Sequence, residues 1–391
     1  MRFIVFALLV ASLGLALVAG SAAGQAEELG NGLFLPAVMS DFTPSWHWGN
    51  TYTVTVSTRT TNPPLAAIDH SGRPHLFWSY SIADNQIHHV YLDGATWRST
   101  LPGSGIDGDS SLSNAPVVTD DNRIHLAWYN KLDTAGDRPY RYVHAIFTGN
   151  AWSGASEVFR SKYSTINAWP RLDDGGRLRV GITNGFLAWR AYLQFEGVGG
   201  WQELASFSLP NDADIIWPDA SNGAHVYGDD STDMRYWRWT GGSLSTTGQS
   251  LGPGKFYGRS MIFDGANNVH VAWKASESVN GMPATIVHHQ CVDNQRRASA
   301  VTWPGDTQAA REMAGATDGG TLYVLAWQEP GRKRIMLWDG CNPIVATTIP
   351  SDPTGSEVLR AVAVSSAPRK VCVFSQQGTT ADYAVRCADI D

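Results

Sequence analysis

The chain carries little charge for its length. Only 17% of its 391 residues are charged, and Asp and Glu outnumber Lys and Arg by 36 to 29, for a formal net charge of -7. Proteins that bind the nucleic-acid backbone need a basic face. We therefore expect no nucleic acid among the partners of this protein.

Several sequence motifs are missing. There is no Gly-x-Ser-x-Gly, His-Glu-x-x-His, P-loop or dinucleotide-binding pattern, and no Cys-x-x-Cys or Cys/His spacing that is typical of zinc. We expect no cofactor and no metal. A catalytic activity is not established by the sequence, although enzymes that assemble a site from distant loops need no such motif.

Long apolar runs are absent after the N-terminus. Phe3 to Val18 is almost unbroken in its hydrophobicity, follows Met1-Arg2, and precedes small residues at 19–24. This pattern predicts a signal peptide over 1–24 and an exported, secreted protein without a membrane span in its mature form. An uncleaved anchor is the alternative. We expect residues 25–50 to be a linker, residues 51–391 to be one domain, and the mature chain to be a monomer.

Cysteine is scarce, with four residues in all. Cys372 and Cys387 fall on predicted neighbouring antiparallel strands, which makes them the favoured disulfide in an exported protein. Cys291 and Cys341 are the remaining pair. The alternative is four buried thiols.

Glycine, proline and aromatic residues are plentiful, and they follow a repeat. One strand recurs seven times and ends in an aromatic residue in its clearest copies; the copies end at 78, 128, 182, 228, 273, 327 and 374, in steps of 45 to 54 residues. The clearest copies are Pro74-His75-Leu76-Phe77-Trp78 and Ile124-His125-Leu126-Ala127-Trp128. An Asp/Asn/Gly turn that suits a tight hairpin precedes most copies. Repeats of about fifty residues are typical of the blades of a β-propeller.

The ends of the repeat region complement each other. The last copy lacks a fourth strand, and an alternating strand at Thr51–Ser57 precedes the first copy. Pairing the two would hide both sheet edges. We therefore predict an all-β, seven-bladed β-propeller with four-stranded antiparallel blades, closed by the N-terminal strand joining the last blade.

The repeat phrase resembles that of a known superfamily. The Asp-x-x-Gly-x-x-His-Leu-x-Trp phrase and the turn Asp93-Gly94-Ala95-Thr96-Trp97 are similar to the repeats of sialidase-like, or BNR (Asp-box-like), β-propellers. The turn is one residue shorter than an Asp box and lacks its leading Ser, and the Arg-Ile-Pro motif of sialidases is absent. The resemblance thus implies a divergent member and supports the fold, but not sialidase activity.

Three arginines occupy similar places in the last three repeats. Arg259, Arg311 and Arg360 lie 14, 16 and 14 residues before the aromatic that ends the next strand. Neighbouring blades would bring them to one side of the channel mouth, where guanidinium groups can grip a carboxylate. The resemblance implies the same use, because sialidases hold a carboxylate with three arginines from different blades. The alternative is three separate surface or ion-paired arginines, with Glu312 as a neighbouring partner.

Other residues have both a binding and a packing interpretation. Trp169 and Trp217, each followed by Pro, would stack on a sugar at the mouth or pack between blades. His75, His125, His225 and His270 recur at one strand position, and we interpret them as core histidines because such positions diverge around a ring. Asp107-Gly108-Asp109 is interpreted as a solvated turn and not as a calcium site.

Taken together, these features favour a noncatalytic binding or recognition propeller that takes a glycan at its mouth. The alternatives are a sialidase-like glycoside hydrolase or lyase acting on extracellular glycans, and a protein-docking scaffold. Catalytic residues are not assigned by the sequence.

Overall fold

The computed structural model describes only part of the chain. The described residues are 45–55, 64–79, 86–102, 110–112, 116–131, 140–162, 166–173, 177–184, 190–210, 213–219, 223–229, 233–245, 248–253, 257–263, 268–274, 287–292, 298–303, 312–318, 320–329, 331–350, 356–378 and 382–391. The predicted signal peptide, most of the predicted linker and the turn at 107–109 lie outside them. Within these ranges all regular structure is β-strand, and no helix is long and apolar enough to cross a membrane.

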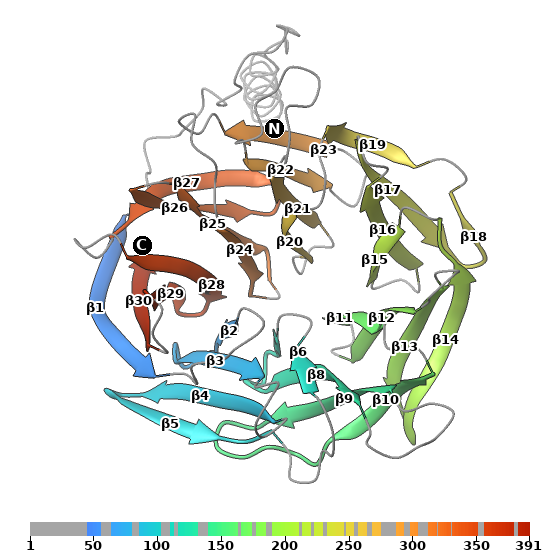
Figure 1. Cartoon of the computed structure of the whole chain (residues 1–391), viewed down its shortest axis with the longest axis horizontal. Helices are drawn as coiled ribbons and strands as arrows, with labels where there is room; N and C mark the ends of the chain where they lie inside the picture. The colour runs from blue at the N-terminus through green and yellow to red at the C-terminus, as the bar shows by residue number, and fades with distance from the viewer. Residues whose placement is uncertain are drawn as a thin grey trace, which may run out of the picture. The chain divides into compact units, whose positions relative to one another are not determined.

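The described strands form seven separate antiparallel sheets around a common centre (Figure 1). Six of these sheets, numbered 1 to 6 here, are made of consecutive strands. Sheet 1 contains β2 (Leu65–Ile68), β3 (Pro74–Ser79), β4 (Ile87–Asp93) and β5 (Thr96–Thr100). Sheet 2 contains β6 (Ser110–Leu112), β7 (Val117–Val118), β8 (Ile124–Lys131), β9 (Tyr140–Phe147) and β10 (Ser156–Ser161). Sheet 3 contains β11 (Ile166–Leu172), β12 (Leu178–Asn184), β13 (Arg190–Gly197) and β14 (Gly200–Ser208).

The second half of the chain repeats this arrangement. Sheet 4 contains β15 (Ala213–Pro218), β16 (Gly223–Asp229), β17 (Asp233–Thr240), β18 (Ser243–Leu244) and β19 (Gln249–Pro253). Sheet 5 contains β20 (Tyr257–Phe263), β21 (Val269–Lys274), β22 (Val287–Val292) and β23 (Ala298–Trp303). Sheet 6 contains β24 (Glu312–Thr317), β25 (Leu322–Glu329), β26 (Arg332–Asp339) and β27 (Asn342–Ile349).

The remaining sheet, the closing sheet, joins the two ends of the chain. It contains β28 (Glu357–Ser366), β29 (Arg369–Gln377), β30 (Asp382–Ile390) and, outermost, β1 (Trp46–Thr55). β1 pairs with β30 in antiparallel register from Trp46↔Ile390 to Thr55↔Asp382. The N-terminal strand therefore supplies the missing fourth strand of the last repeat, and it begins at Trp46, inside the range predicted as linker.

The prediction of seven equivalent four-stranded blades sealed in a ring is wrong. Six blades are continuous in sequence, and the closing sheet combines two distant segments. Sheets 2 and 4 have five strands each, since one strand position is split in two. In sheet 2 the split coincides with Pro116, which has no N–H to donate to the ladder. Among the described strands, neighbouring sheets pack closely at six junctions, and the junction of sheets 4 and 5 is not one of them.

The core lies between the sheets. Trp128 and Phe147 of sheet 2 pack with Phe77 of sheet 1, and Trp327 of sheet 6 shares a cluster with Val373 of the closing sheet. Second-strand aromatics are buried, with Trp128 0% and Trp327 1% exposed. Each sheet thus hides its apolar faces only against its neighbours, which is why the chain needs several repeats.

Both cysteine pairs lie at disulfide distance. Cys372 on β29 is opposite Cys387 on β30, as predicted, with Cα atoms 4.0 Å apart. Cys291 on β22 is linked to Cys341, which follows β26, with Cα atoms 5.4 Å apart. The first pair ties two strands of the closing sheet, and the second ties sheet 5 to sheet 6.

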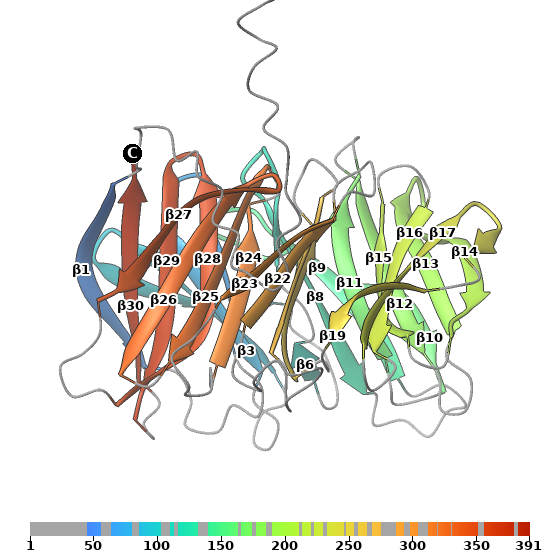
Figure 2. The same ribbon diagram turned by 90° about the horizontal axis from the view of Figure 1, so that it is seen from above.

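The strand order gives the ring two distinct ends. Strands run between two faces of the disc, as Figure 2 shows from the side. Innermost strands of all sheets start at the same face, which we call the mouth end. The hairpin turns that join the first strand of a sheet to the second lie at the opposite face, which we call the turn end.

Candidate functional site

Two of the three predicted arginines lie on innermost strands that the structure describes. Arg259 is the third residue of β20 and Arg360 is the fourth residue of β28, whereas Arg311 precedes β24 in the sequence and lies outside the described residues. β24 packs against both β20 and β28 (Figure 1). The backbone therefore places Arg259 and Arg360 near the starts of two innermost strands that flank β24.

Two of these arginines share a backbone feature that the sequence did not reveal. The pairing of β20 with β21 shifts register between Tyr257 and Ser260, which brackets Arg259. The pairing of β28 with β29 shifts between Leu359 and Ala361, which leaves Arg360 as an extra residue. Such bulges re-aim a side chain and are over-represented beside functional sites.

Arg360 is the member of the trio whose side chain the structure describes. It is half-buried, and its Nε donates to Oε1 of Gln376 at 2.9 Å. The side chains of Arg259 and Glu312, and the whole of Arg311, lie outside the described residues. The structure thus places Arg259 and Arg360 by backbone position, and the grouping of all three arginines stays a prediction.

A buried ionic cluster lies beside Arg360, and sequence reasoning missed it. Glu357, at the start of β28, accepts from Lys333 Nζ at 2.7 Å and from both terminal nitrogens of Arg386 at 2.7 and 2.6 Å. Burial acts to raise the pKa of Glu357, but the hydrogen bonds from Arg386 and Lys333 outweigh it and lower that pKa. Two cations and one carboxylate give the cluster a net positive charge.

The predicted tryptophans are buried. Trp169 on β11 and Trp217 on β15 are 7% and 6% exposed and belong to one hydrophobic cluster between sheets 3 and 4. Their burial agrees with the packing interpretation. Neither ring presents a face to solvent at the mouth.

The carboxylates that begin the inner hairpin turns stabilise those turns by accepting hydrogen bonds. Asp69 accepts from the backbone N–H groups of Ser71 and Arg73, and Asp219 accepts from that of Gly223 and from the guanidinium of Arg238. Asp219 directly follows β15, at the turn end. It is 3% exposed.

The repeated histidines are core residues, as predicted. The side chains of His75, His125, His225 and His270 are at most 5% exposed. Each contacts a side chain of a neighbouring strand or sheet, namely His89, His144, Tyr236 and Tyr323 respectively.

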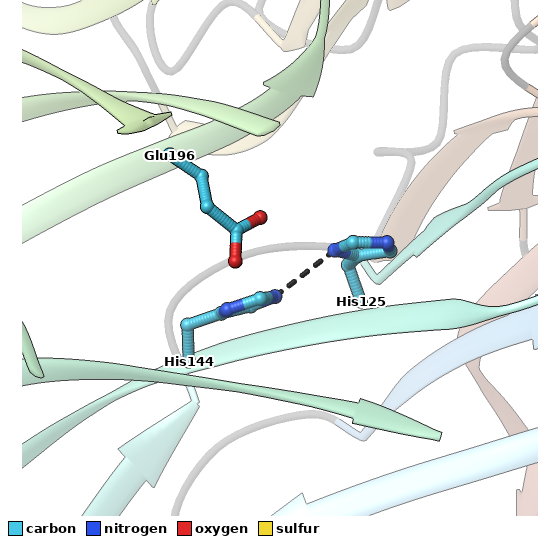
Figure 3. Close-up of side chains that lie close together, drawn as sticks. All are labelled: His125, His144 and Glu196. Atoms are coloured by element: carbon cyan, nitrogen blue, oxygen red, sulfur yellow. Dashed lines mark hydrogen bonds between the residues drawn. The ribbon is translucent and has the colours of Figure 1, made fainter. Parts of the chain in front are cut away.

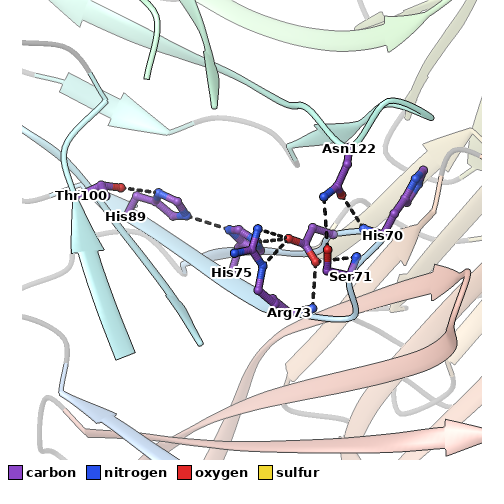
Figure 4. Close-up of polar contacts among 8 residues, drawn as sticks. His70, Ser71, Arg73, His75, His89, Thr100 and Asn122 are labelled. Carbon is purple, nitrogen blue, oxygen red and sulfur yellow. Dashed lines mark hydrogen bonds and ion pairs between the residues drawn. The ribbon is translucent and has the colours of Figure 1, made fainter. Parts of the chain in front are cut away.

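The first of these contacts belongs to a continuous series of polar contacts (Figure 4). His75 Nε2 lies 3.3 Å from Asp69 Oδ2, His75 Nδ1 lies 2.9 Å from His89 Nε2, and His89 Nδ1 lies 2.7 Å from Thr100 Oγ1. Burial acts to raise the pKa of Asp69, but hydrogen bonds from His75 and Arg73 outweigh it and lower the pKa to about 2. Burial lowers the pKa of both histidines, so this series is a set of neutral rings ending on a carboxylate.

A second histidine pair has a different neighbour. His125, His144 and Glu196 bring three possible metal-ligating atoms within 4.8 Å of one another (Figure 3). Burial lowers the pKa of His125 to about 4 and that of His144 to about 3. Glu196 comes from sheet 3, so only the packing of sheets 2 and 3 brings it to the pair, and no local signal in the sequence identifies it.

Comparison with known proteins supports the fold. The chain is similar to the polysaccharide lyase Uly1, with a TM-score of 0.54, 10% identity, and coverage of 88% of this chain and 100% of that chain. It is also similar to the β-propeller domain of the Trilobed protease from Pyrococcus furiosus, with a TM-score of 0.52, 9% identity, and coverage of 85% and 93%. No protein-family model and no curated protein sequence matches it. At such low identities these similarities show a β-propeller and nothing further.

Proposed function

We propose that this chain is an exported, noncatalytic β-propeller that binds an anionic glycan at its mouth end. The observation that supports this most is that Arg259 and Arg360 lie near the starts of the innermost strands β20 and β28, which both pack against β24, the strand that Arg311 directly precedes in the sequence. A carboxylated or sulfated sugar offers the planar or tetrahedral anion that guanidinium groups bind through paired hydrogen bonds.

The charge around Arg360 supports the choice of an anionic ligand. Glu357 is fully engaged by Lys333 and Arg386, so this carboxylate is not left to neutralise Arg360. The partner of the Arg360 Nε is the neutral amide of Gln376.

Export and family membership belong to the same proposal. The apolar N-terminal run and the two cysteine pairs at disulfide distance support secretion, since disulfides persist in oxidising compartments. The repeat phrase supports a divergent sialidase-like, Asp-box-like lineage. The buried Trp169 and Trp217 have no part in the proposed site.

The proposal is tested by titrating the purified protein with polyuronates, sulfated polysaccharides and neutral polysaccharides in a calorimeter. We expect binding to the anionic polymers only. Arg360→Gln and Arg259→Gln should each weaken it by about tenfold or more, because a hydrogen bond to a charged group contributes about 1.5–3 kcal/mol.

Arg98→Gln is the matched control. Arg98 lies on the outermost strand β5 with 59% of its side chain exposed, far from the innermost strands. Equal loss of binding in Arg98→Gln and Arg360→Gln would contradict a site at the mouth. Release of shorter products from the polymer would contradict the noncatalytic part and favour a lyase or hydrolase.

A further inference from the structure

Two equivalent histidine pairs exist in neighbouring sheets. In sheet 1, Nδ1 of His75 lies 2.9 Å from Nε2 of His89, and in sheet 2, Nδ1 of His125 lies 3.0 Å from Nε2 of His144. The rings of both pairs are stacked, with centroids 5.1 Å apart in each case. The same local design therefore occurs twice, and any difference between the copies stands out.

The surroundings of the two pairs also correspond. A tryptophan of the next sheet donates its Nε1 to a hydroxyl beside each pair, at 3.1 Å in the first case and 3.2 Å in the second. Trp152 donates to Thr100 beside the first pair, and Trp201 donates to Ser156 beside the second. Each tryptophan in turn lies opposite a residue of its own hairpin, which is Phe147 in sheet 2 and Glu196 in sheet 3.

The pair in sheet 1 is a closed arrangement. The carboxylate of Asp69 is placed to accept from His75 Nε2, and Thr100 is placed to donate to His89 Nδ1. The apolar ring of Phe147 packs edge-on against His89, with centroids 4.8 Å apart. The carboxylate near this pair, that of Asp69, belongs to the same sheet and also accepts from the backbone of its own turn, and an apolar ring occupies the side that faces the next sheet.

The pair in sheet 2 differs at both ends. Thr119 stands six residues before His125, where Asp69 stands six residues before His75. Nε2 of His125, like that of His75, is buried without a hydrogen-bond partner, but His75 Nε2 has the Asp69 carboxylate 3.3 Å away. In place of the phenyl ring of Phe147, the second pair faces the carboxylate of Glu196, which forms no ion pair with any cationic residue that the structure describes.

We propose that His125, His144 and Glu196 bind one Zn²⁺ ion at the junction of sheets 2 and 3. Two imidazole nitrogens and a carboxylate oxygen are a common donor set for this ion, with a fourth position left for water. This site lies toward the turn end and is independent of the anionic glycan proposed for the mouth.

The geometry of the nitrogens suits a metal. Two nitrogens 3.0 Å apart can both lie about 2.05 Å from one ion, with an angle of about 94° between the bonds. The ion would take the place of the proton between the two nitrogens, which moves to the other nitrogen of its own ring, so that both imidazoles stay neutral with their protons on His125 Nε2 and His144 Nδ1. The Glu196 side chain is half-buried and has to approach the ion, since the donor atoms are spread over as much as 4.8 Å.

The ion would act as a clamp between sheets. The histidines belong to β8 and β9 of sheet 2, whereas Glu196 belongs to β13 of sheet 3. A ligand that binds only the folded state stabilises that state by mass action. Zn²⁺ should therefore raise the melting temperature, by about 4 °C at a free concentration one hundred times the Kd.

The test uses tag-free, full-length mature protein, dialysed against EDTA and then titrated with Zn²⁺. We expect one saturable equivalent, and binding weakened by at least about 10- to 100-fold in Glu196→Gln, because losing a ligand costs no less than losing an outer-shell partner. Glu203→Gln, an exposed glutamate on the adjacent strand β14, is the matched control and should bind as the wild type does.

Several results would overturn the proposal. These are the absence of saturable Zn²⁺ binding, a Glu196→Gln protein that binds as tightly as the wild type, or equal losses in the two variants. Melting curves in EDTA show whether Glu196→Gln is folded. If Glu196→Gln is not folded, Co²⁺ is added to the wild-type protein instead. A d–d absorption band typical of nitrogen and oxygen ligation, which disappears when Zn²⁺ is added, supports the site. The absence of such a band refutes it.

Discussion

Replacing Glu357 with Gln should destabilise the protein far more than the same change on the surface. The side chains of Glu357, Lys333 and Arg386 are 1%, 3% and 12% exposed, so water cannot take over the role of the carboxylate. An amide removes the negative charge and directs an NH₂ group at a cationic donor. Removing one partner of a buried ion pair typically costs about 3–5 kcal/mol, because the remaining charge stays buried without compensation.

This cost converts into a melting temperature. Unfolding entropy is about 2.1 cal/mol/K per residue, which for the predicted domain of roughly 340 residues is about 0.7 kcal/mol/K. A loss of about 3–5 kcal/mol therefore lowers the melting temperature by about 4–7 °C. Differential scanning calorimetry measures the shift, and urea unfolding provides the free energy independently.

The control is Glu157→Gln. Glu157 also forms a close pair with an arginine, Arg160, at 2.5 Å, but their side chains are 36% and 45% exposed. Exposed pairs contribute about 0–1 kcal/mol, so the expected shift is below about 1.5 °C. If Glu357→Gln melts no lower than Glu157→Gln, the buried cluster does not stabilise the junction of sheet 6 and the closing sheet.

The same cluster predicts a pH dependence. The pKa of Glu357 is lowered in the folded state from an ordinary value of 4.5. Its contribution is therefore fully present above pH 4.5 and is lost as the pH falls through the lower folded value. The stability difference between wild type and Glu357→Gln should shrink over that acidic interval and stay constant from pH 5 to 7. A difference that is unchanged on acidification would refute the assignment.

Three further results are expected. Replacing Cys291 and Cys341 together with Ser should cost about 4 kcal/mol in urea unfolding, since the bond closes a loop with a sequence separation of 50, and no loss would mean that the bond does not form. Gly181→Ala should cost about 1–3 kcal/mol, because its Cβ would overlap a backbone carbonyl oxygen of sheet 4, whereas Gly154→Ala meets nothing within 4 Å and should be near neutral by the same thermal melt. Asp69→Asn should remove about 2 kcal/mol at pH 7, and the wild type should lose that advantage between about pH 4 and pH 2; parallel stability profiles of the two proteins over this range would contradict the lowered pKa.

The candidate site was only partly predictable. The spacing of Arg259, Arg311 and Arg360 from the following strand predicts that they are equivalent, because strand and turn lengths repeat along the chain. The register shifts at Arg259 and Arg360 depend on how each strand pairs with its neighbour, and a one-residue shift leaves no clear trace in an alternating pattern.

Local chemistry determined most of the fold. Alternating strands and Asp/Asn/Gly turns depend on residues that are close together in the sequence. Together with the repeat of about fifty residues, they are enough to predict antiparallel propeller blades. The same pattern identified the N-terminal strand that completes the closing sheet and the opposition of Cys372 and Cys387. The core role of the repeated histidines also follows from the repeat, since equivalent positions on different blades cannot converge on one ion.

Only the tertiary structure decided which side chains meet across neighbouring sheets. Glu357 accepts a hydrogen bond from Lys333 of sheet 6, and Glu196 of sheet 3 lies near the histidine pair of sheet 2. The burial of Trp169 and Trp217, and the splitting of strands in sheets 2 and 4, likewise depend on how one sheet packs on the next. These contacts join residues that are tens of positions apart in the sequence. Whether they form depends on how neighbouring sheets are rotated and spaced, and that geometry arises only when the sheets pack together.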